Sequence, residues 1–135
     1  MKKILLAYCS TTAFMTLIDL LWIGVIAREI YKEGLGSLMA DQPNFVYGAL
    51  FYLIFPVGLM VFAVMPSEMS SSWTKPLTLG ALFGFFAYAT YDLTNLATLR
   101  DWPIGLSLID VAWGSAVSGA AAVVGTATLQ HLSAK

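Results

Sequence analysis

Three aspartates interrupt long apolar stretches of the sequence, and their carboxyl groups are the best candidates for chemistry. They are Asp19, Asp92 and Asp110. At the centre of a membrane-spanning helix an aspartate costs about 2.5–3.5 kcal/mol, so such residues are uncommon and usually face the interior of a helix bundle. The same stretches contain no lysine or arginine to pair with them. A carboxyl group buried without a cation tends to hold its proton, which suits proton exchange or cation binding.

Polar and aromatic residues recur on the same helical faces as the aspartates. A spacing of i, i+4, i+8 and i+11 is shared by Gly84, Tyr88, Asp92 and Asn95. Such a face must turn towards protein or water, because lipid cannot satisfy its hydrogen bonds. The candidate polar site predicted from these patterns comprises Asp19, Trp22, Tyr88, Tyr91, Asp92, Asn95, Asp110 and Trp113.

A local repeat surrounds two of the aspartates. The segments LIDLLWIG (17–24) and LIDVAWGS (108–115) share Leu-Ile-Asp, with a tryptophan three residues after the aspartate. The simpler interpretation is a local one, in which the indole lies beside the carboxyl group on the same helix, shields it and can donate a hydrogen bond. An inverted internal duplication, as found in many transporters, is the alternative.

The composition places the chain among membrane proteins. Hydrophobic residues make up 59% and charged residues 11%, against about 25% charged residues in soluble domains. One cysteine and one histidine exclude an internal disulfide, a cysteine-based metal cluster and a multi-histidine metal site. The sequence has no phosphate-binding glycine loop, and no cofactor is expected. A net charge of −1 with scattered basic residues gives no footprint for nucleic acid.

Apolar segments of about 20 residues, the length that a bilayer requires, occur at about 4–27, 45–65, 77–99 and 104–128. They predict an all-α fold: a single domain over 1–135, built as an integral membrane bundle of four transmembrane helices. The first segment begins like a secretion signal, but it passes through Asp19 and lacks a cleavage site, so we expect it to be retained. The link after it favours a short surface helix around Ile30. The link RDWP makes the last two segments an antiparallel hairpin.

An even number of spans puts both termini on one side of the membrane. That side would carry Lys2, Lys3, Lys75 and Lys135, and the other side Arg28, Lys32 and Arg100. This small excess, with two lysines at the start of the chain, favours cytoplasmic termini. At a rise of ~1.5 Å per residue, all three aspartates fall in the same half of the bilayer. Small residues four apart, Gly80 with Gly84 and Gly114 with Ser118, predict close helix packing.

Several motifs together resemble a known family: YATYDLTNLATL at 88–99, Trp102, Asp110 with Trp113, and Asp19 with Trp22. Over nearly the whole chain, the sequence is similar to the bacterial family of predicted membrane proteins called domain of unknown function 2177. The resemblance implies a small four-span, multi-pass protein of the bacterial inner membrane. It implies no particular activity.

Three functional hypotheses remain open. The first is proton-linked transport or permeation of a small cationic or amphipathic compound by a homo-oligomer, since 14.6 kDa is small for a complete pathway. The second is a membrane enzyme or binding protein for a lipid or another apolar molecule, with Asp92 as general acid or base. The third is an assembly subunit that docks onto a membrane-protein partner. A purely structural network is disfavoured, because interhelical hydrogen bonds in membranes contribute on average only ~0.6 kcal/mol.

Overall fold

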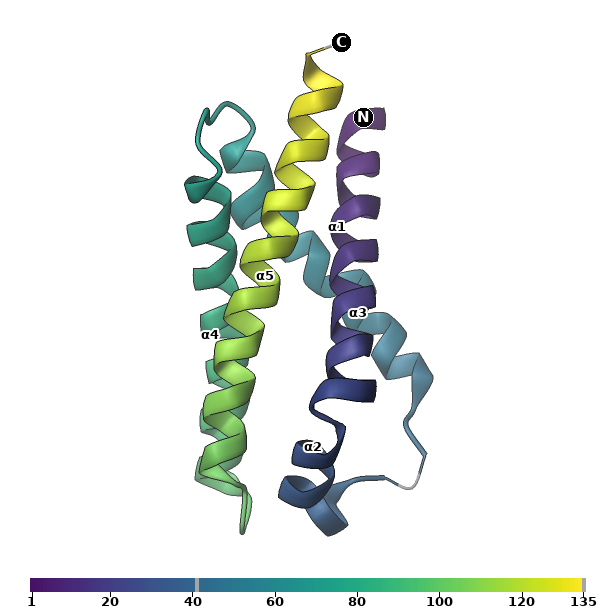
Figure 1. The fold of residues 1–135 in the computed structure, drawn as a ribbon, viewed down its shortest axis with the longest axis vertical. Helices are drawn as coiled ribbons and strands as arrows, with labels where there is room; N and C mark the ends of the chain where they lie inside the picture. The colour runs from purple at the N-terminus through teal and green to yellow at the C-terminus, as the bar shows by residue number, and fades with distance from the viewer. Residues whose placement is uncertain (41, 135) are drawn as a thin grey trace.

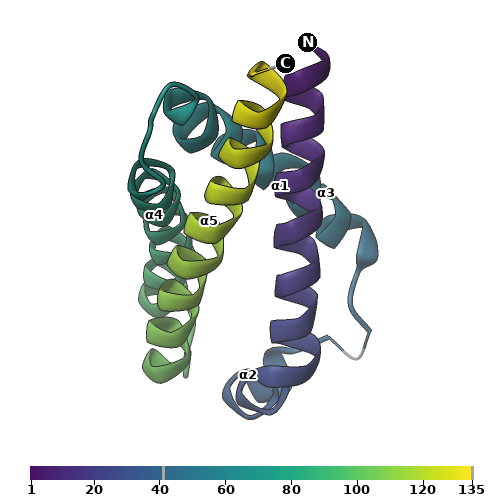
Figure 2. The same ribbon diagram turned by 45° about the horizontal axis from the view of Figure 1, so that its top comes forward.

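The computed structural model describes residues 1–40 and 42–134, and over these residues it is a helical bundle without β-strands (Figure 1). In chain order the helices are α1 (Lys2–Leu21), α2 (Arg28–Leu35), α3 (Phe45–Leu59), α4 (Thr74–Thr98) and α5 (Ile104–Ser133). Two views turned by 45° show the chain ends at the same end of the bundle, with α5 between α1 and α4 (Figures 1 and 2).

Three helical stretches are long and apolar enough to cross a membrane: Lys2–Ile26, Phe45–Ser67 and Ile104–Ser133. They coincide closely with three of the predicted spans. The first extends α1 through a π-helical turn at Trp22–Ile26, and the second extends α3 through another at Met60–Val64. In the second stretch Pro56 lies inside the helix, where it removes one backbone N–H donor.

The fourth predicted span, 77–99, corresponds to α4. This helix has 25 residues, about 37 Å at ~1.5 Å per residue, so it is long enough to cross a bilayer. It is more polar than the other three stretches and does not count among the apolar spans. The described structure therefore establishes three apolar spans and a fourth long helix packed along α5.

Small residues bring α4 and α5 into close contact, as the sequence predicted. A Cβ atom added at Gly80 would lie 2.6 Å from the carbonyl oxygen of Ser118, and one added at Gly84 would overlap the carbonyl oxygen of Gly114. The two backbones therefore approach so closely that neither glycine can carry a side chain. On its opposite side α5 packs against α1, where Met15 joins Val117 in the buried core.

The first half of α3 stands apart from the bundle. One face of its last turns and of the turn that follows is buried in the core, where Leu59 and Val64 have no exposed surface. At its beginning Phe45 is 82% and Tyr47 71% exposed. Figure 1 shows α3 passing behind α1 and α5 at an angle, so its two ends lie at different distances from the other helices.

The predicted surface helix around Ile30 is α2. It packs against the start of α5, where a Cβ atom added at Gly34 would lie 3.3 Å from Leu106 and 3.4 Å from Pro103. The loop between α4 and α5 is as short as expected for an antiparallel hairpin, and its one strained residue is Asp101, with φ of 58°. These contacts bring α2 and the hairpin to the same end of the bundle, opposite the chain termini (Figure 1).

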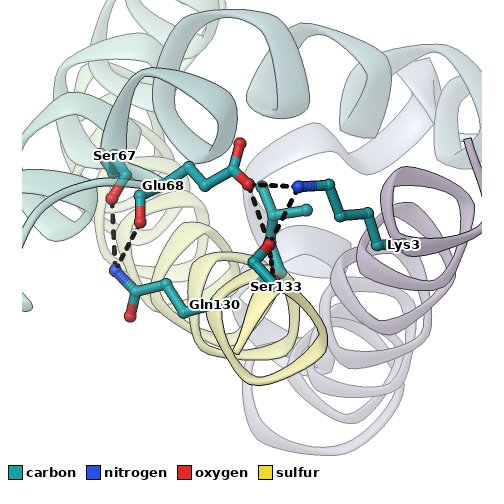
Figure 3. A network of polar contacts seen from close by, with 6 residues as sticks. Lys3, Ser67, Glu68, Gln130 and Ser133 are labelled. Atoms are coloured by element: carbon teal, nitrogen blue, oxygen red, sulfur yellow. Dashed lines mark hydrogen bonds and ion pairs between the residues drawn. The ribbon is translucent and has the colours of Figure 1, made fainter. Parts of the chain in front are cut away.

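At the terminal end, a polar network ties α1, α5 and the link after α3 together (Figure 3). Lys3 Nζ lies 2.7 Å from Glu68 Oε1, and the Ser133 hydroxyl donates to the same carboxyl group over 2.9 Å. The side-chain amide of Gln130 donates to the carbonyl oxygens of Ser67, Glu68 and Ser70. The network fixes both chain ends to one loop.

Replacing Glu68 by glutamine is expected to lower the thermal unfolding temperature modestly near neutral pH. Hydrogen bonds from Lys3 and then Ser133 hold the pKa of Glu68 below its ordinary value of 4.5. Stabilisation by a lowered carboxyl pKa is present above the unfolded value and disappears as the pH falls through the folded one. The wild type and Glu68→Gln should therefore differ near pH 7 and converge near pH 3, as measured by circular dichroism in detergent micelles.

Lys2→Gln serves as the control, because Lys2 is exposed and forms no salt bridge among residues 1–40 and 42–134. Added salt should reduce the Glu68 effect, since exposed ion pairs are screened. A Glu68→Gln effect that persists unchanged at low pH would contradict the ionic origin of the stabilisation.

Candidate functional site

Asp19 is buried near the end of α1, with 2% of its surface exposed. Its Oδ1 accepts a hydrogen bond of 2.7 Å from Nε1 of Trp113 on α5, and its Oδ2 lies 3.4 Å from the donating hydroxyl of Tyr52 on α3. The indole of Trp22 stacks on Trp113, with ring centroids 4.1 Å apart and 7° between the planes. Both donors are neutral. The carboxyl group of Asp19 on α1 therefore receives hydrogen bonds from α3 and α5 but no positive charge to balance its own.

Asp19 lines a cleft of about 990 Å³ between α1, α3 and α4. The cleft exists because the first half of α3 stands away from the other helices. Its walls are mostly apolar and aromatic, and they include Phe51 and Phe55 from α3 and Tyr88 from α4. Among the described residues that line it, Asp19 is the only one with a formal charge. The cleft is therefore apolar and aromatic, and it contains a single buried carboxyl group.

Asp92 lies on α4, facing α5, and is 1% exposed. Its Oδ1 lies 3.4 Å from Nε1 of Trp102, an indole that donates a shorter bond of 3.0 Å to the Ser107 hydroxyl. Its Oδ2 is buried and has no hydrogen-bond partner among the described residues. Asp92 is therefore the least satisfied of the three carboxyl groups.

Asp110 lies on α5 and is the direct neighbour of Asp92, with the two carboxyl groups within hydrogen-bonding reach. It accepts a hydrogen bond from the hydroxyl of Tyr31, which reaches it from α2. Burial, together with the bond to Asp110, raises the pKa of Tyr31 well above its ordinary value. The tyrosine consequently remains a neutral donor at physiological pH, and α2 is attached to α5 through this contact.

The sequence matches, over residues 4–127, a family described as a predicted membrane protein, DUF2177. The chain belongs to this family. Membership confirms the resemblance noted in the sequence and, with three apolar helical spans, identifies a multi-pass membrane protein. No curated protein and no solved structure matches the chain.

In this member of the family, most of the predicted site residues lie close together, but they form two groups. Asp19, Trp22 and Trp113 make one group at the cleft, and Tyr88 lines the same cleft. Asp92 and Asp110 form the second group, inside the α4–α5 hairpin and outside the residues that line the cleft.

Two predicted residues lie at the margin. Tyr91 is 55% exposed at the edge of the cleft, and its ring meets that of Trp102 edge to face at 5.8 Å. Asn95 is half-buried one turn further along α4. No hydrogen bond joins Asn95 to any of the three carboxyl groups in the described part of the chain.

Three donors to the carboxyl groups were not among the predicted site residues. They are Tyr31 from α2, Tyr52 from α3 and Trp102 from the loop between α4 and α5. A general signal existed, because buried carboxyl groups need hydrogen-bond donors and the chain is rich in tyrosine hydroxyls and tryptophan indoles. Across residues 1–40 and 42–134, no cluster of three or more His, Cys, Asp or Glu is placed to hold a metal ion.

Proposed function

We propose that the protein binds an amphipathic cation in the cleft and carries it across the membrane in exchange for protons. The observation that carries this proposal is Asp19, a buried carboxylate whose bonding partners are neutral, in the wall of an otherwise uncharged cleft. A buried carboxylate without a counter-ion is costly. A ligand that brings a positive charge to Asp19 removes that cost.

The walls of the cleft favour a ligand with an apolar body. A volume of about 990 Å³ suits a small molecule or a short alkyl chain. Aromatic rings from Phe55 and Tyr88 meet edge to face at 6.1 Å in the same wall, and such rings attract cations through their faces. The charged head would therefore lie near Asp19, with its apolar part along α3.

Lipid binding without transport is the second candidate, and the apolar walls favour it. A membrane enzyme is less well supported, because the chain's single histidine, His131, is exposed in the last turn of α5, far along that helix from Asp110. A docking subunit would use the exposed first half of α3 as its contact surface. Identifying the molecule that occupies the cleft would distinguish between these functions.

The proposed topology has four spans, with α4 as the third, and both termini on the cytoplasmic face of a bacterial inner membrane. The position of the two termini at one end of the bundle supports an even number of spans (Figures 1 and 2). The partners are membrane lipid and further copies of this chain, since a 14.6 kDa unit is small for a complete pathway. The exposed start of α3 offers an apolar contact for such copies.

The test uses purified protein in liposomes that enclose a pH-sensitive dye, with decyltrimethylammonium as the probe. Its permanent charge limits passive crossing, and decanol serves as the matched neutral compound. We expect an outward gradient of the cation to drive protons into the liposomes, whereas decanol and protein-free liposomes give no signal. Equal binding of decanol and the cation, without proton flux, would overturn the proposal in favour of lipid binding.

A further inference from the structure

Asp92 and Asp110 lie side by side between α4 and α5, and the described titratable groups that face Asp110 bring no positive charge. Their carboxyl groups are within hydrogen-bonding reach of each other, yet neither has a hydrogen to donate while both are ionised. Two carboxylates at this range repel each other strongly, and one shared proton relieves the repulsion. The two carboxyl groups are therefore positioned for a hydrogen bond, which forms once one of them carries a proton.

The other contacts of the pair identify where the missing hydrogen belongs. Asp92 Oδ1 already faces the indole N–H of Trp102, and Asp110 already accepts from Tyr31. Asp92 Oδ2 is the atom left over: it is buried and unpartnered among the described residues. Buried polar atoms in native proteins almost always have a partner, so the orphan oxygen points to a bound species. A proton on either acid of the pair supplies the missing donor.

The surroundings favour a proton over a metal ion. The titratable groups that face Asp110 are Tyr31 from α2, Asp19 from α1 and Asp92 from α4, and none of them is a cation. Within the described chain, the one salt bridge joins Lys3 to Glu68 at the opposite end of the bundle. Among the described residues, no group of three or more His, Cys, Asp or Glu side chains is placed to hold a metal ion.

We infer that Asp92 and Asp110 share a single proton and form a proton-binding site separate from the cleft at Asp19. The role of this site in exchanging protons for a cation rests on the proposed function. The shared proton itself is testable without any ligand. The two sites are near enough to communicate, because the charge of Asp19 acts on Asp110. A cation bound at Asp19 cancels that charge and favours release of the proton, which is the coupling that exchange requires.

The experiment is infrared spectroscopy of the purified wild type near neutral pH, in H₂O and in D₂O. The observable is the carbonyl stretching band of a protonated carboxylic acid. The wild type should show this band, with a shift in D₂O. Asp92→Asn and Asp110→Asn should each abolish the contribution of the pair, because the remaining acid loses its anionic neighbour, gains an amide donor and ionises. Glu68→Gln, which removes a carboxyl group at the opposite end of the bundle, is the matched control and should keep that contribution.

Several results would overturn the inference. The first is absence of the carbonyl band in the wild type. The second is survival of the pair's contribution to that band in Asp92→Asn or Asp110→Asn, which would mean that one acid holds its own proton. Asparagine has nearly the size of protonated aspartate, so size-exclusion profiles and thermal unfolding verify folding. If a variant of the pair does not fold, the pH titration of the band in Asp19→Asn decides: a shared proton predicts that the band falls in two separate steps as the pH rises, and a single step would contradict it. Failure of cation transport with the band intact refutes the proposed function alone.

Discussion

Asp19→Asn is expected to weaken the binding of decyltrimethylammonium by about 30-fold or more while the protein remains folded. Removing one partner of a buried charge pair typically costs about 2–5 kcal/mol, and 2 kcal/mol corresponds to about 30-fold in Kd. Asparagine keeps an oxygen that can accept the hydrogen bond from Trp113 Nε1, so the indole is not left unpaired. Quenching of tryptophan fluorescence gives a direct measurement, since Trp113 is bonded to the mutated residue.

Asp101→Asn is the matched control for Asp19→Asn. It removes the same charge from the exposed loop between α4 and α5, outside the residues that line the cleft. It should leave the affinity within about twofold, the range of a screened surface charge. Binding of decanol should not respond to Asp19→Asn. If the cation and decanol lose affinity equally, the carboxylate does not recognise charge and its role is in the packing of the cleft.

Gly84→Ala is expected to have the largest effect on stability. The added methyl group would overlap the carbonyl oxygen of Gly114 and lie within 2.7 Å of Ser118 Cβ, so α4 and α5 must separate. Overpacking a close contact typically costs about 1–3 kcal/mol, and a clash with rigid backbone belongs at the upper end of that range. Reversible unfolding in mixed micelles, followed by circular dichroism, measures the free energy of unfolding.

Gly105→Ala provides the comparison, because it makes the same chemical change in the first turn of α5. A Cβ atom at Gly105 would meet nothing within 4 Å. Alanine favours helix over glycine by about 1 kcal/mol, so this variant should be neutral or slightly stabilising. Equal stability of the two variants would show that the α4–α5 contact tolerates separation.

The sequence was sufficient to predict the helices and the packing of α4 on α5. Hydropathy locates the spans because a bilayer imposes a length and an apolar composition on them. The spacing of Gly80, Gly84, Gly114 and Ser118 predicts the tight helix pair because small residues are what close packing in lipid requires. Exposing a carboxyl group to lipid is costly, which likewise predicts that Asp19, Asp92 and Asp110 face the interior. All three are at least half-buried in the structure.

The partners of those carboxyl groups were not predictable from local patterns. The repeat around Asp19 and Asp110 favoured each tryptophan beside its own aspartate, but Trp113 instead donates across helices to Asp19 while Trp22 stacks on it. The rotation of each helix about its axis decides which donor reaches which acid. That rotation is set by the packing of whole helix faces, so a spacing of three residues along one helix does not encode it.

The π-helical turn at Trp22–Ile26 makes the chain length at this point a determinant of the site. Its closing bond joins Ala27 N to Trp22 O, so the turn holds one residue more than an α-helical turn, in which residues i and i+4 are bonded. The extra residue is accommodated within this turn, whereas a one-residue deletion in the α-helical turns before it would rotate everything beyond the deletion by about 100°. Tyr31 would then turn away from Asp110, although the hydropathy and length of the span would scarcely change. Descendants of this sequence can therefore vary many apolar side chains of α1 freely, whereas an insertion or deletion in the α-helical turns that precede Trp22 would break the contact between α2 and α5.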